Sequence, residues 1–70
     1  MADVPAHITG TVWKIEVKVS SVVKAGDVLV ILESMKMEMP VEAPEDGTVS
    51  EIRCKETQAV NEGDVLVVIK

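Results

Sequence analysis

A lysine between two methionines, Met35-Lys36-Met37, is the residue of this 70-residue chain best suited to chemistry. Lysine carries its amine on a flexible four-carbon stem, and the free amine can attack an activated carboxyl group to form an amide. Met35 and Met37 are uncharged and adaptable, so they can offer a modifying enzyme apolar contacts on both sides. Glu33 and Glu38 bracket the motif. The motif predicts covalent modification at Lys36; the alternatives are a solvated lysine and two core-filling methionines.

Few other side chains could carry chemistry. His7 is the single histidine and Cys54 the single cysteine, and no acid–base pair converges with either in the sequence. We expect His7 at the surface and Cys54 as core filling. The chain is therefore not expected to be an enzyme.

Composition narrows the classes of partner. The net charge is −5 and Trp13 is the single aromatic residue, which argues against nucleic-acid binding. No stretch has the length and apolarity of a membrane span, and the first residues lack a signal-peptide pattern. One cysteine allows no internal disulfide, which is typical of a reducing compartment. We expect a cytoplasmic protein with neither a nucleic-acid nor a membrane partner.

An internal repeat organises the chain. Residues 10–33 match residues 47–70 without a gap, at an offset of 37, and both copies contain Gly-Thr-Val and Gly-Asp-Val-Leu-Val. Extended upstream, the repeats cover 4–33 and 41–70, and residues 34–40 join them. Two copies are too few for a solenoid. We therefore expect one domain, residues 1–70, in which two related halves close on each other.

The pattern within each repeat is that of strands. Val and Ile dominate, as in β-sheets. Apolar runs at 28–32 and 65–69 predict buried strands, and Gly26 and Gly63, each followed by aspartate, predict turns. Period-two alternation predicts one inward face, made by Trp13, Ile15, Val17 and Val19 and by Ser50, Ile52 and Cys54 in the second copy. These features predict an all-β domain of short antiparallel strands in two related sheets.

The joint must contain a turn. Residues 28–43 include no glycine and are far longer than a typical strand of about 5–6 residues. The polar interruption places a tight turn at Met35-Lys36, although such turns prefer Asn-Gly. Local propensity favours the alternative, a helix over 33–39. A turn built from unfavourable residues is typical of a functional constraint.

The segment Glu-Ser-Met-Lys-Met-Glu-Met-Pro at 33–40 resembles the attachment sequence of the biotinyl/lipoyl attachment domain family. The order of the surrounding motifs, over residues 4–70, is also similar to that family. The resemblance implies a flattened β-barrel or sandwich of two four-stranded antiparallel sheets with quasi-two-fold symmetry, the barrel-sandwich hybrid. It places the modified lysine at a hairpin tip and both termini at the opposite end. The chain departs from the family at 20–21 and 57–58, where many members have Gly-Asp, which leaves the conformation of these loops open.

The resemblance implies a biotin carboxyl carrier. Lys36 corresponds to the covalent biotin attachment residue, and Met35 and Met37 to the flanking residues that biotin protein ligase recognises. Biotin would shuttle a carboxyl group between biotin carboxylase and carboxyltransferase, most often in an acyl-CoA carboxylase. The resemblance fits a small standalone carrier, monomeric in isolation, or an excised carboxylase domain. The alternatives are a lipoyl carrier with lipoate as cofactor, whose family members usually have Asp-Lys-Ala at the tip, and an unmodified hybrid-motif interaction module.

Overall fold

The computed structural model describes residues 2–70, and Met1 lies outside the described part. These residues form eight β-strands and no helix, which confirms the all-β prediction; the helix alternative at 33–39 is wrong. In chain order the strands are β1 (Ala2–Pro5), β2 (Gly10–Ile15), β3 (Val22–Val23), β4 (Val28–Ser34), β5 (Met37–Glu42), β6 (Gly47–Ile52), β7 (Ala59–Val60) and β8 (Val65–Ile69).

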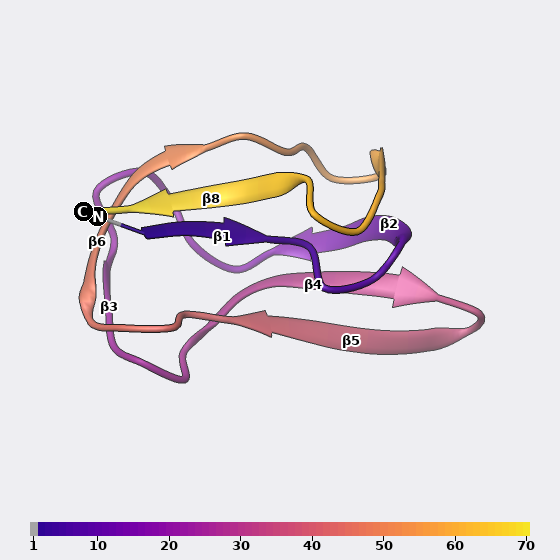
Figure 1. Ribbon diagram of the computed structural model, residues 1–70, viewed down its shortest axis with the longest axis horizontal. Coiled ribbons are helices and arrows are strands. Elements are labelled where there is room, and N and C mark those ends of the chain that lie inside the picture. The colour runs from indigo at the N-terminus through magenta and orange to yellow at the C-terminus, as the bar shows by residue number, and fades with distance from the viewer. Residues whose placement is uncertain (1) are drawn as a thin grey trace.

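The strands form two four-stranded antiparallel sheets, as expected. One sheet has the order β1-β8-β6-β3 and the other β5-β4-β2-β7 (Figure 1). The sheets stay separate and do not close into a barrel, so the sandwich part of the expectation is the one that holds. Ala2 pairs with Ile69, which brings the two ends of the chain together, and the β4–β5 hairpin lies at the opposite end of the molecule (Figure 1).

The two halves repeat the same pairing. Strands β2 and β6 lie 37 positions apart, as do β3 and β7. The β4–β5 pair aligns Leu32 with Met39, and the β8–β1 pair aligns Ile69 with Ala2 at the same offset. The β4–β5 hairpin and the paired chain ends are therefore equivalent positions of a quasi-two-fold structure.

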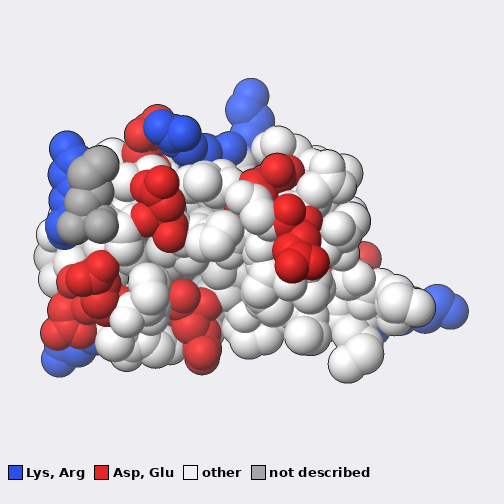
Figure 2. All heavy atoms as spheres, viewed as in Figure 1, with Lys and Arg blue, Asp and Glu red and all other residues white. Residues whose placement is uncertain are grey.

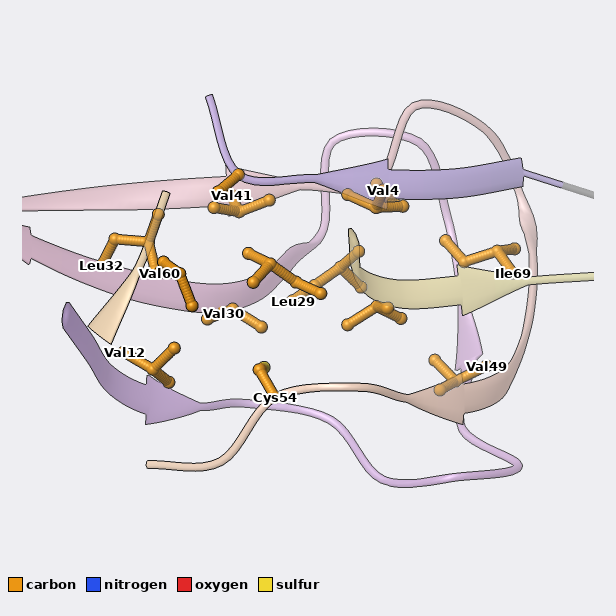
Figure 3. Packing of buried hydrophobic residues seen from close by; sticks show 14 of the residues in the cluster. Val4, Val12, Leu29, Val30, Leu32, Val41, Val49, Cys54, Val60 and Ile69 are labelled. Carbon is orange, nitrogen blue, oxygen red and sulfur yellow. The ribbon is translucent and has the colours of Figure 1, made fainter. Parts of the chain in front are cut away.

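Aliphatic side chains from both sheets fill the space between the layers. Figure 3 shows them pointing toward one another, and Leu29, Leu32 and Leu66 are fully buried. No charged or polar side chain among residues 2–70 is buried. Because each fully buried Leu or Val contributes about 1.5–3 kcal/mol, this core is the main apolar source of stability in so short a chain.

The predicted inward face of β2 is wrong at Trp13. Its side chain is 48% exposed, whereas Val12 is fully buried. The register of β2 with β4 shifts between Val12 and Lys14. The register of β6 with β8 shifts likewise, between Val49 and Glu51. This β-bulge reverses the alternation of side chains. Beyond it, Ile15 and Val17 still pack against the core, while Val19 lies in a loop and is exposed.

Four tight turns share one geometry, at residues 18–21, 24–27, 55–58 and 61–64. In each, the fourth N–H donates to the first carbonyl oxygen over 2.9–3.2 Å. The first N–H donates over 2.9–3.0 Å to the side-chain oxygen of the fourth residue, which is Ser21, Asp27, Gln58 or Asp64. The third residue has positive φ: 81° at Ser20, 93° at Gly26, 71° at Thr57 and 93° at Gly63. The loops at 20–21 and 57–58 therefore keep the glycine-type conformation without glycine.

These turns bond the two halves to each other. Ala6 donates its N–H to the carbonyl of Asp64 over 2.8 Å and accepts from the N–H of Gly63 over 2.9 Å. Val12 exchanges the same two bonds with Thr57 and Gln58. The quasi-two-fold equivalents of these two exchanges join Ala43 to Gly26 and Asp27, and Val49 to Ser20 and Ser21. Ala6, Val12, Ala43 and Val49 are all buried, although Ala6 and Ala43 lie just after the ends of strands β1 and β5. The turns therefore satisfy backbone groups that water cannot reach.

Replacement of Thr57 by glycine is expected to stabilise the protein by about 1 kcal/mol. A β-branched residue at φ 71° is strained, and glycine relieves this strain at some cost in unfolded-state entropy. Chemical denaturation measures the change. Thr48→Gly is the matched control in strand β6, where glycine should destabilise by about 0.5–1 kcal/mol. An equal loss of stability in both variants would show that the backbone of Thr57 is not strained.

Cys54 lies in the core, as predicted, and is 6% exposed. Its position is equivalent to that of Val17 in the other half. Burial raises the pKa of the Cys54 thiol, because desolvation disfavours the thiolate. The thiol is thereby kept in its neutral, unreactive form.

The raised pKa predicts a loss of stability at alkaline pH. The folded protein holds the thiol proton to higher pH than the unfolded chain does. The linked stability is therefore full below the unfolded pKa of about 8.5 and falls as pH rises through the folded value. Cys54→Val should remove this part of the pH dependence. Free energies of unfolding measured from pH 7 to pH 10 check it, and parallel curves for the two proteins would refute it.

Candidate functional site

Lys36 lies on a two-residue turn at the end of the β4–β5 hairpin. The register pairs Glu33 with Glu38 and Ser34 with Met37, so only Met35 and Lys36 remain in the loop. The predicted turn is confirmed at these two residues. The length of the glycine-free segment 28–43 required a turn, and the polar interruption of the apolar pattern located it at these two residues.

Both turn residues have a left-handed backbone. Met35 has φ 52° and Lys36 has φ 67°, the pattern of the type I′ hairpin turn. This turn suits the twist of the two strands, but each non-glycine residue in it costs roughly 1–2 kcal/mol. The sequence had already indicated that Met and Lys are unfavourable in such a turn, and the positive φ of both residues shows where the cost arises. Strain retained at an exposed tip supports the hypothesis of a functional role.

The side chains of the tip are open to solvent. Met35 is 92% exposed, Met37 is 62% exposed, and Lys36 is also exposed. The core-filling alternative for the two methionines is therefore wrong. Figure 2 shows this end of the molecule as a mostly uncharged projection with basic atoms at its extremity. The arrangement offers an amine between two apolar side chains.

Electrostatics leave the Lys36 amine unpaired. The two ion pairs among residues 2–70 are Lys14–Glu16 and Arg53–Glu51. Glu33 and Glu38 stand directly opposite each other, and like charges in such a pair are unfavourable. Neither carboxylate holds the ammonium, so the side chain is not tied down against the hairpin.

The surface hollows lie away from the tip. A groove of about 490 Å³ runs between β1 and β5, with Val4, Val41 and the prolines Pro5, Pro40 and Pro44 among its lining. Two others lie beside residues 52–58 and beside β8. None of these three is lined by residues 33–39. The Lys36 side chain therefore does not lie in any of these three hollows.

The other residues considered for a functional role lie at surface or turn positions. His7 is exposed, as expected, and lines the groove between β1 and β5. Asp27 and Asp64 cap turns. Across residues 2–70 no group of His, Cys, Asp or Glu side chains is arranged to hold a metal ion.

The part of the chain that the structure describes contains no helix with the length and apolarity needed to cross a membrane.

Comparison with known proteins finds a matching family model and relatives of similar sequence. It matches the family model described as "Biotin-requiring enzyme" over residues 1–69. It is 49% identical over 41 residues to methylcrotonoyl-CoA carboxylase subunit alpha of Rattus norvegicus, covering 59% of this chain and 6% of that protein. It is 51% identical over 41 residues to the biotinylated protein TB7.3 homolog of Mycobacterium leprae, covering 59% of this chain and 58% of that protein.

A solved structure agrees with these matches. The urea carboxylase of Kluyveromyces lactis superposes with a TM-score of 0.94 at 38% identity, covering 99% of this chain and 6% of that one. The chain thus corresponds to a small part of the carboxylases, and its match spans less than two thirds of each relative named above.

Replacement of Met35-Lys36 by Asn-Gly is expected to stabilise the fold by about 2 kcal/mol, because these residues favour the left-handed turn. Thermal and chemical unfolding measure the gain. Asn-Gly placed at Thr11-Val12, in strand β2, is the control and should destabilise. A less stable Met35→Asn/Lys36→Gly protein would show that the turn residues are not strained.

Proposed function

The chain belongs to the family of biotin-requiring enzyme domains, and on that premise we propose that it carries biotin on the Nζ atom of Lys36. Biotin is the cofactor of these carrier domains, which are themselves non-catalytic. One observation supports the assignment to Lys36 above all: this lysine occupies the exposed two-residue tip of the hairpin opposite the chain ends. Met35 and Met37 flank it as apolar contacts for a modifying enzyme.

The residues present fit the cofactor. An amide would form when the neutral amine of Lys36 attacks an activated biotin carboxyl group, as the bond to the activating group breaks and the nitrogen loses a proton. The unpaired and exposed side chain leaves this amine accessible. Once bound, biotin would carry the carboxyl group, while the protein would extend and orient the cofactor. The β4–β5 hairpin gives that reach, since it projects from the body of the domain (Figure 1).

Three enzymes would act on such a carrier. We propose that biotin protein ligase attaches the cofactor at the tip. The attached biotin would then take up a carboxyl group at a biotin carboxylase. It would deliver this group at a carboxyltransferase to an acyl-CoA acceptor. The resemblance to methylcrotonoyl-CoA carboxylase supports this choice of partners and acceptor.

The same proposal covers the domain as a whole. Residues 1–70 form a single carrier domain, with repeats at 4–33 and 41–70 and the hairpin joint at 34–40. The equal strand spacing in the two halves supports this division. We propose that the domain is monomeric in isolation and acts in the cytoplasm, a location supported by the unpaired thiol of Cys54.

Co-expression with biotin protein ligase in biotin-containing medium tests the attachment. Intact-protein mass spectrometry should find one biotinyl group on the wild-type protein and none on Lys36→Arg. Lys24→Arg is the matched control at another exposed lysine and should be modified fully.

An adduct that survives Lys36→Arg would contradict the assignment of the site. A folded wild-type protein without an adduct would contradict the carrier function. A lipoyl group in place of biotin would favour the lipoyl alternative.

A further inference from the structure

Gly10, the first residue of β2, lies against the base of the hairpin that carries Lys36. A Cβ atom added at this position would stand 2.6 Å from the carbonyl oxygen of Glu33 and 3.3 Å from the Cβ of Ser34. The φ of Gly10 is outside the left-handed region, unlike those of Gly26 and Gly63. The position therefore demands glycine for space and not for backbone conformation.

The contact between Gly10 and Glu33 lies at the point where β2 stops pairing with the hairpin. Thr11 pairs with Glu33, the last residue of β4 that β2 holds in register. Beyond it, β4 and β5 pair only with each other, because β5 is an edge strand. In Figure 1 this part of the hairpin projects past the rest of the molecule. A displacement of the backbone at Glu33 is therefore carried outward to Lys36.

We propose that Gly10 is a positioning residue for the modification of Lys36. The absence of a side chain at Gly10 lets the backbone of β4 lie close against β2, and this close contact sets the direction in which the tip projects. A methyl group there would have to push away a backbone carbonyl, which cannot rotate aside as a side chain can. The unsupported hairpin is the part free to yield. The inference rests on the proposed attachment of biotin at Lys36.

The quasi-two-fold symmetry supplies a matched control. Gly47 is equivalent to Gly10, and a Cβ there would meet the Cγ2 of Ile69 and stand 2.8 Å from the carbonyl oxygen of Lys70. Ile69 is buried, so Gly47→Ala also strains the core. Its displacement falls on the chain ends, at the opposite end of the molecule from Lys36 (Figure 1). The two substitutions are thus alike in steric cause and differ in what they move.

The experiment compares Gly10→Ala with Gly47→Ala and with Val23→Ala, a core truncation far from the tip. The wild-type protein and all three variants are assayed with biotin protein ligase at a temperature where each is folded, with sucrose added to favour the folded state. We expect kcat/KM for biotinylation to fall about 10–100-fold in Gly10→Ala, as for a misplaced reacting group. It should stay close to wild type in both controls. Amide chemical shifts of residues 35–38 should change in Gly10→Ala alone.

The outcomes separate the two proposals. Equal rates in Gly10→Ala and Gly47→Ala, or unmoved tip amides in Gly10→Ala, would overturn the positioning role. Failure of Gly10→Ala to fold where Gly47→Ala folds would assign Gly10 to stability alone and also overturn it. If the wild-type protein is not biotinylated, the proposed function fails, and the amide shifts alone decide whether Gly10 positions the tip.

Discussion

The fold depends on an exchange of backbone hydrogen bonds between its two halves. Ala6, Val12, Ala43 and Val49 are buried, and each bonds through both its N–H and its C=O to a turn of the other half. The N–H that each turn contributes comes from its third residue, the one with positive φ. Without these turns eight buried backbone groups would be unpaired, each at a cost of about 1–3 kcal/mol. Neither half can therefore satisfy its own backbone, and the two must fold together.

The position of the tip follows from this symmetry. Strands β4 and β5 pair in the same register as β8 and β1, but the first pair is joined by a turn and the second consists of the chain ends. The structure thus presents a closed hairpin at one end and both termini at the other (Figure 1). A lysine in that closed turn is displayed to solvent, and a longer protein joined through the termini would leave it clear. The strained backbone of Met35 and Lys36 is the cost of using these two residues there.

Much of this arrangement could be predicted from the sequence, for identifiable reasons. The repeat and the apolar runs predicted the two sheets, and the length of residues 28–43 required a turn at Met35-Lys36. Trp13 was misplaced because a β-bulge leaves no trace in the polar and apolar pattern. The left-handed conformations of Ser20 and Thr57 were hidden because they are imposed by bonds to the other half and not by residue type. The close contact at Gly10 was hidden because it is made with the neighbouring strand at Glu33, 23 positions away in the chain.

We propose that Lys36 carries the cofactor and that the rest of the domain supports it. On this proposal biotin protein ligase selects Lys36 by its place at the tip, although other exposed lysines are available. The most direct measurement is peptide mapping by tandem mass spectrometry of the wild-type protein after modification by biotin protein ligase. We expect biotin on the peptide containing Met35-Lys36-Met37, and on Lys36 alone. Biotin on another lysine, or spread over several, would contradict it.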